Sequence, residues 1–293
     1  MAVLVALAAA FFYAVASVLQ QWEAERQPSE RELRPSLLAR LAVKPKWLVG
    51  LVFDIAGYVA QWIALSNGSL VLVQPLLVVG LLFALPIKAR VSPYRMQGWD
   101  WSGAVITTVG LAVFLTVSHP AAGISNVRPL TWSVLLAGTF CVSAVLVVAG
   151  IGSTPRWKAL SYGTAAGVIY GACAALTKTC AHLLSLGVVQ LFETWQPYVL
   201  AAGGIAGMVL AQSAFQAGPL DASLPSLSAT DPVVSVLIGA IAFGEGIRTG
   251  IVPSTLEALA LVVMVVGIFM LAHTEAVNAV KARDRARRPQ EVT

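Results

Sequence analysis

The sequence predicts an all-α integral membrane protein with nine transmembrane helices, in which two inverted four-helix repeats are joined by a linking helix. Three observations lead to this prediction. First, 58% of the 293 residues are hydrophobic and only 11% are charged, whereas roughly a quarter of the residues in a soluble domain are charged. Second, the chain contains nine apolar runs of membrane-spanning length. Third, the pattern of small and polar residues near the N-terminus recurs in the second half of the chain.

The nine apolar runs are separated by polar or turn-forming segments, and one helical crossing needs about 20 residues. They comprise residues 2–22, 46–66, 69–90, 101–118, 129–150, 159–185, 196–217, 219–243 and 253–273. The connections at 66–68 and 217–219 are very short. The second and third runs, and the seventh and eighth, are therefore predicted to form tight hairpins.

The sixth run carries a helix-packing signal, because Gly163, Gly167 and Gly171 follow one another at four-residue spacing. Residues at this spacing share one helix face, and small residues there allow a second backbone to approach closely. Lys178 continues the same stripe, which places a charged amine on the packed side of a membrane helix. The stripe therefore predicts a close helix contact beside a buried lysine.

The same design occurs 157 positions earlier, near the N-terminus. Ala6, Ala10 and Ala14 stand where the second half has its glycines, and Tyr13 aligns with Tyr170. This match indicates that the chain arose by duplication.

Further matches extend the repeat to four runs in each half. Residues 55–57 match 205–207 at an offset of 150, and Gly110 matches Gly267 at 157. Because one run separates the two sets of four, the second set is predicted to cross the membrane in the opposite direction. The predicted domains are a first repeat, a linking transmembrane helix and a second inverted repeat, at residues 1–118, 119–158 and 159–273. Such repeats are typical of secondary transporters, which bind substrate near the bilayer midplane.

Lysine and arginine are distributed unevenly over the predicted loops, and an excess of them marks the cytoplasmic side. With the N-terminus outside, sixteen lie on the inner side and only Arg128 and Arg248 on the outer side. The chain is therefore predicted to be a multi-pass protein of the cell (cytoplasmic) membrane, with its N-terminus outside and its C-terminus in the cytoplasm.

Two predicted cytoplasmic segments are rich in basic residues. In the loop at 24–46, Leu37, Leu38 and Leu41 predict a short amphipathic helix on the membrane surface. Residues 274–293 form a basic cytoplasmic tail. Anionic lipids are the expected neighbours of these segments, and no nucleic-acid partner is predicted.

Two carboxylic acids lie inside the predicted helices, where charged groups are rare and costly. Asp54 is near the middle of the second run, and Tyr58 and Gln61 share its helix face. Asp231 is in the eighth run, directly before Pro232. For each acid two interpretations stay open: a proton-coupling or cation-binding group, or a structural hydrogen-bonding group.

The other candidate substrate or coupling residues are polar side chains within the predicted spans. Lys178 is expected to neutralise one of the two acids, to hold the negative part of a substrate, or to extend its amine to the outer interface. Tyr13 and Tyr170 either line a substrate cavity or pack against neighbouring helices without a role in transport. Gln74 precedes a proline in the third run, and Gln212 either lines the site or bonds a neighbouring helix.

The sequence lacks the motifs of common soluble enzymes. It contains no glycine-rich phosphate loop, no Cys-x-x-Cys pair and no His-Glu-x-x-His motif. Its three cysteines lie in apolar runs, so no disulfide framework is suggested. The protein is not expected to be an enzyme, and no cofactor or resident metal is predicted.

A pattern of small residues and prolines runs through both halves of the chain. It comprises Trp47, Gly50, Gly57, Ala60, Ala64, Leu70, Val71, Pro75 and Leu76 in the first half, and Ala214, Gly218, Leu224, Pro225, Phe243, Gly244 and Glu245 in the second. This pattern resembles that of the drug/metabolite transporter superfamily, of the EamA type, and within it the NIPA-like branch. The resemblance implies nine spans with an external N-terminus.

Together these features predict a transporter of the drug/metabolite type. It would move a small polar or amphipathic solute by alternating access, with proton coupling. A NIPA-like permease for magnesium or another divalent cation is the first alternative. A lipid flippase or a non-transporting membrane partner is the second, and a homodimer is left open.

Overall fold

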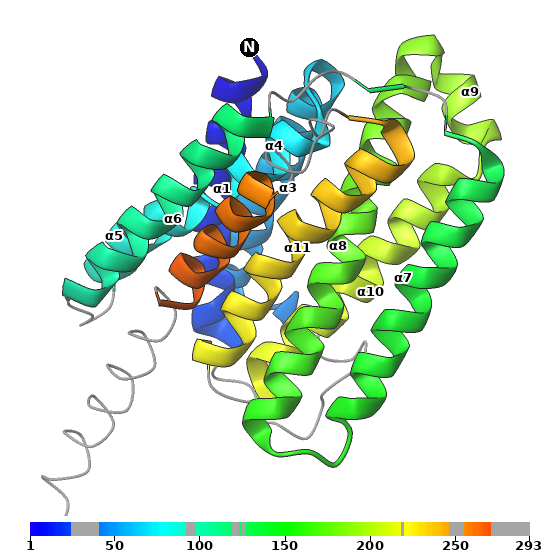
Figure 1. Cartoon of the computed structure of the whole chain (residues 1–293). Helices are drawn as coiled ribbons and strands as arrows, with labels where there is room; N and C mark the ends of the chain where they lie inside the picture. The colour runs from blue at the N-terminus through cyan, green and yellow to red at the C-terminus, as the bar shows by residue number, and fades with distance from the viewer. Residues whose placement is uncertain are drawn as a thin grey trace, which may run out of the picture.

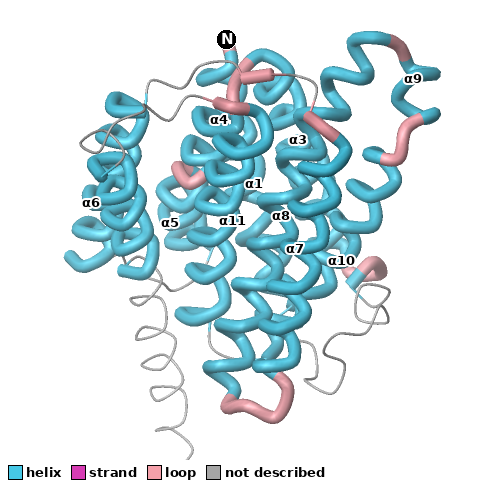
Figure 2. Tube along the Cα trace, turned by 45° about the vertical axis from the view of Figure 1, so that its right-hand side comes forward, coloured by secondary structure: helices cyan, strands magenta, loops and turns pink. Residues whose placement is uncertain are grey.

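A computed structural model of the chain describes residues 1–24, 41–91, 98–118, 123–124, 127–217, 220–245 and 255–270. All regular structure in these residues is helical (Figures 1 and 2). The helices are α1 (Ala2–Ala24), α3 (Pro45–Asn67), α4 (Leu70–Leu77), α5 (Gly80–Val91), α6 (Gly98–Ser118), α7 (Pro129–Gly150), α8 (Pro155–Leu186), α9 (Val188–Glu193), α10 (Gln196–Ala217) and α11 (Leu220–Phe243), followed by a helix at Thr255–Met270.

Seven of the described helices are long and apolar enough to cross a membrane. Shorter apolar helical segments lie at Leu70–Ala84 and Thr255–Met270. These lengths and compositions identify a multi-pass membrane protein, as predicted. The predicted bounds of the runs at 129–150 and 196–217 coincide with α7 and α10.

The centre of the bundle is α8, a helix of 32 residues whose apolar span is 78% buried. It packs mainly against α11, α10 and α7, and it also touches α3. The first part of the chain has its own central helix, because α1 packs against α3, α4 and α5. The N-terminus and α9 lie at one end of the bundle, called the α9 end below, and the α7–α8 turn lies at the other (Figure 1).

The predicted glycine stripe of α8 lies directly against α11. A Cβ atom added to Gly163 would lie 2.6 Å from the carbonyl oxygen of Ser223, and one on Gly167 would lie 2.9 Å from that of Leu227. A Cβ added to Gly171 would lie 2.8 Å from the Val234 side chain and 3.1 Å from the carbonyl oxygen of Asp231. The close helix contact predicted from the spacing is therefore confirmed.

The predicted span at 69–90 is divided in the structure, which corrects the prediction of one continuous helix. Residues 78–79 form turns between α4 and α5, with N–H groups bonded to carbonyls three residues back. Pro75 lacks an N–H group and its ring crowds the preceding helical turn. Gly80 then packs so closely on α1 that an added Cβ would lie 2.8 Å from the carbonyl oxygen of Ala10. By contrast, α11 continues through both of its prolines.

A second close contact joins α6 to the helix at Thr255–Met270. An added Cβ on Gly110 would lie 2.6 Å from the backbone nitrogen of Met264, and one on Gly267 would lie 2.5 Å from that of Thr107. Thr107 thus meets Gly267, and Gly110, three residues later on α6, meets Met264, three residues earlier on the other helix. The two helices therefore run antiparallel.

The predicted cytoplasmic segments fall largely outside the described residues. These include Leu37 and Leu38 of the interfacial helix and the whole tail at 274–293. Leu41 is described, and it is buried against Trp47 at the start of α3. The short helix α9 was not predicted, because six residues are too few to register as a span.

Candidate functional site

Polar side chains of α1 and α3 meet inside the bundle. The hydroxyl group of Tyr13, on α1, donates a hydrogen bond of 2.5 Å to Oε1 of Gln61, on α3. The Tyr13 ring lies against Gly57, one turn before Gln61, where an added Cβ would be 2.9 Å from the ring. Asp54 and Asp231 both lie within electrostatic range of the Tyr13 hydroxyl.

The second half of the chain contributes a matching group. The Tyr170 ring, on α8, lies against Gly207 of α10, with 2.6 Å from an added Cβ to the ring. Tyr170 is also within electrostatic range of Asp54 and Asp231. The Asp231 carboxylate accepts a hydrogen bond of 3.1 Å from the hydroxyl group of Ser235, one turn later on α11. Residues predicted in four separate helices are thus brought together.

Asp54 has a polar neighbour from α1. Gln20 packs over Gly50, where an added Cβ would be 2.9 Å from its Cγ, and its side chain lies near the Asp54 carboxyl group, although Nε2 of Gln20 has no hydrogen-bond partner among the described residues. Gln20 was not among the predicted site residues. Its position one turn before the end of α1 could have indicated a role in the site, since a buried amide is unusual in an apolar helix.

Tyr58 links α3 to α8 and so joins the two halves of the bundle. Its hydroxyl group lies 3.0 Å from Oγ1 of Thr177. Cys173 and Cys180 lie within electrostatic range of the same hydroxyl. The predicted face of Asp54, Tyr58 and Gln61 therefore points toward α1 and α8.

Gln74 and Gln212 are both buried, with exposed fractions of 1% and 2%. Nε2 of Gln74, on α4, and Oε1 of Gln212, on α10, have no hydrogen-bond partner. The structure does not link either residue to the aspartates, so their predicted role in substrate binding stays a prediction.

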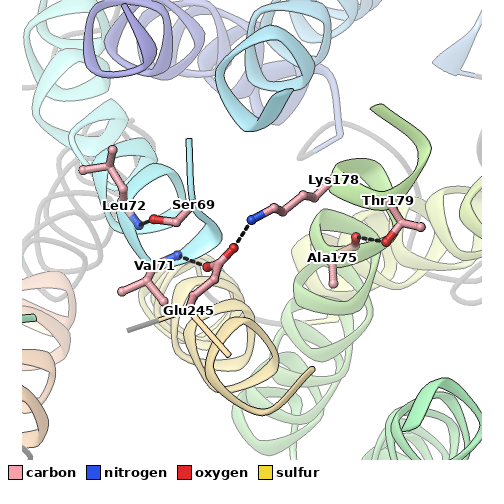
Figure 3. A network of polar contacts seen from close by, with 7 residues as sticks. All are labelled: Ser69, Val71, Leu72, Ala175, Lys178, Thr179 and Glu245. Carbon is pink, nitrogen blue, oxygen red and sulfur yellow. Dashed lines mark hydrogen bonds and ion pairs between the residues drawn. The ribbon is translucent and has the colours of Figure 1, made fainter. Parts of the chain in front are cut away.

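The structure gives Lys178 a carboxylate partner that was not predicted. Its Nζ forms an ion pair with Oε1 of Glu245, the second residue after the end of α11 (Figure 3). Oε2 of Glu245 accepts a hydrogen bond of 3.0 Å from the backbone N–H of Val71, in the first turn of α4. The charge of Lys178 is therefore compensated by Glu245, and not by Asp54 or Asp231 as hypothesised. Glu245 was considered only for a helix-ending or gating role and was not among the predicted site residues, because it lies beyond the predicted span and only the fold brings it to Lys178.

A small pocket of about 130 Å³ opens beside this ion pair at the α9 end. It is lined by Leu65, Ser66, Lys178, Ala181, His182, Ser185 and Phe243. The pocket is therefore lined by the lysine of the ion pair but by neither Asp54 nor Asp231.

The described residues include no group of three or more His, Cys, Asp or Glu side chains that could hold a metal ion. A cation bound between the two aspartates would need further oxygen ligands from amides, phenols, backbone carbonyls or water.

The sequence has a relative that matches it along nearly its whole length. It is 30% identical over 281 residues to an uncharacterized protein of Corynebacterium glutamicum, and the alignment covers 95% of this chain and 97% of that protein. No protein-family model matches the sequence, and no solved structure matches it. The chain belongs to the same family as the Corynebacterium glutamicum protein.

Proposed function

We propose that this protein is a secondary transporter of the drug/metabolite type that moves a small polar or amphipathic solute across the cytoplasmic membrane by alternating access. Protons would be the coupling ion, and the α9 end would face outward. The observation that carries the proposal is that Asp54 and Asp231, from different halves of the chain, both lie within electrostatic range of Tyr13 and Tyr170. Acids inside membrane helices are costly and commonly mark ion or substrate pathways.

Equivalent contacts in the two halves support an arrangement of two repeats. Tyr13 lies on Gly57 and its counterpart Tyr170 lies on Gly207. The two tyrosines are 157 positions apart and the two glycines 150, which are the offsets of the sequence repeat. Each tyrosine therefore packs on the corresponding glycine of the corresponding helix.

The contact between α6 and the helix at Thr255–Met270 supports inversion of the second repeat. Gly110 and Gly267 are counterparts in the sequence repeat, and so are Thr107 and Met264. Gly110 meets Met264, and Gly267 meets Thr107. Such reciprocal pairing is what a two-fold axis produces. Because the helices are antiparallel, such an axis would lie in the plane of the membrane.

The nature of the cluster favours a proton or a positively charged group over an anion. Carboxyl, phenol and amide groups meet there, and Lys178 is engaged by Glu245. A carboxylate can bind and release a proton within the transport cycle. Oxygen-rich surroundings also suit magnesium, which is the second candidate solute.

The proposal can be tested by flux measurements in proteoliposomes. A pH-sensitive dye inside the vesicles would report proton movement when organic amines, amino acids or Mg²⁺ are added outside, with and without a pH gradient. For a transported solute, Asp54→Asn and Asp231→Asn should each lower the proton-driven flux by at least about tenfold, because neither amide can carry the proton. Glu193→Gln, which changes an exposed carboxyl group on α9, should leave the flux unchanged.

Several results would contradict this assignment. Full flux in both asparagine variants would show that the aspartates do not couple transport. Magnesium flux independent of the pH gradient would favour the permease. Movement of a labelled lipid between leaflets, without flux of any solute, would favour the flippase.

A further inference from the structure

Outside the central cluster, a buried ion pair lies at the α9 end. The Glu245 side chain is completely buried, and that of Lys178 is only 15% exposed. The ammonium group of Lys178 also lies 5.0 Å from the centre of the Phe243 ring. A buried ion pair is costly to break, because removal of one partner leaves the other charge uncompensated.

The Glu245 carboxylate is also bonded to the first half of the chain. One oxygen binds Lys178 and the other accepts the N–H of Val71 (Figure 3). That N–H is one of the donors left free at a helix N-terminus, where the helix dipole favours a negative charge. Ser69 occupies the adjacent donor by accepting the N–H of Leu72 at 3.2 Å. Glu245 therefore closes the N-terminus of α4 with a charged hydrogen bond.

The backbone places Glu245 at this position by a sharp turn after α11. Gly244 has a φ of +60°, a conformation that favours glycine. The N–H of Glu245 then returns to the carbonyl oxygen of Gly239 at 3.1 Å. An added Cβ on Gly239 would lie 3.3 Å from the side chains of Leu70 and Val71, so α11 and α4 touch at the same point.

We infer that Lys178, Glu245 and the N-terminus of α4 form the gate that closes the α9 end of the pathway. Lys178 and Glu245 come from the second half of the chain and the N-terminus of α4 from the first, so moving the two halves apart at this end must break the hydrogen bond from Val71 to Glu245. The pocket at the α9 end is lined by Lys178 of this gate together with His182 and Ser185, and by neither of the central aspartates. Alternating access requires such a closure on one side of the binding site. This inference rests on the proposed function.

Accessibility of a native cysteine tests the gate without a known substrate. Cys173 is buried on α8 and lies within electrostatic range of Tyr170 and Asp231, deeper than Lys178. In a Cys141→Ala, Cys180→Ala background it is the remaining thiol. A charged methanethiosulfonate reagent that cannot cross the membrane would be added from the α9 side, and the rate of Cys173 modification would be measured.

Three variants separate the gate from a general loosening of the bundle. Glu245→Gln keeps an oxygen for Val71 but leaves Lys178 uncompensated, and Lys178→Met leaves the Glu245 carboxylate unpaired. Each should raise the modification rate by at least about tenfold. The double variant contains neither lone charge, so it should be modified more slowly than Lys178→Met alone. Glu193→Gln is the control and should match the parent.

The inference is overturned if both single variants are modified at the parental rate while they elute as folded protein. It is also overturned if the two effects simply multiply in the double variant, because the residues would then act independently. If a single variant does not fold, Glu245→Asp takes its place. The shorter side chain cannot reach both Lys178 and Val71, and an unchanged rate there would equally refute the gate. Because labelling needs neither solute nor pH gradient, this result is independent of the flux assay.

Discussion

Substitution of Gly163 by alanine tests whether the stripe on α8 is a true backbone contact. The new Cβ would lie 2.6 Å from the carbonyl oxygen of Ser223. This is shorter than ordinary van der Waals contact, and the obstacle is backbone, so α11 must move. Overpacking of this kind costs about 1–3 kcal/mol. Alanine also gains up to about 1 kcal/mol over glycine in helix propensity, which partly offsets the clash.

Gly204→Ala on α10 is the matched control, because it gains the same helix propensity as Gly163→Ala but meets no clash. An added Cβ there meets no atom within 4 Å, so this variant should be as stable as the parent or more stable. The difference between the two alanine variants should therefore be about 1–3 kcal/mol, with Gly163→Ala the less stable. Thermal unfolding of the purified protein in one detergent measures it. Equal midpoints for the two variants would refute the contact between α8 and α11.

The other contacts give smaller tests by the same unfolding measurement. Tyr13→Phe removes the hydrogen bond to the buried Gln61 and should cost about 1–3 kcal/mol; an unchanged midpoint would mean that the bond is absent. Gly110→Ala and Gly267→Ala should each destabilise the protein by about 1–3 kcal/mol, because both face backbone nitrogen atoms. A large effect from only one of these two would argue against reciprocal pairing.

The parts of the fold set by local pattern could be predicted from the sequence. The bounds of α7 and α10 follow from apolar length. The contact of α8 with α11 follows from glycines at four-residue spacing, because that spacing fixes a helix face whatever the partner. The division of the third span could not be placed in advance. Pro75 weakens the helix, but the close fit of Gly80 on α1 accompanies the break.

Most residues of the candidate site could be predicted from the sequence, but the contacts between them could not. Asp54 and Asp231 are conspicuous because acids are rare in apolar helices. The partner of Lys178 could not be predicted, since Glu245 is 67 residues away and lies beyond the end of α11. A pairing of this kind is a tertiary contact, and no local spacing encodes it.

The central position of α8 has a consequence for how the chain enters the membrane. It is the least hydrophobic of the seven candidate spans and also the most buried. A nascent α8 would gain less than any other span from contact with lipid, and its glycine face matches only α11, which is synthesised later. Insertion of α8 is therefore expected to wait for its neighbours. A chain truncated before α11 should leave α8 poorly inserted and open to degradation.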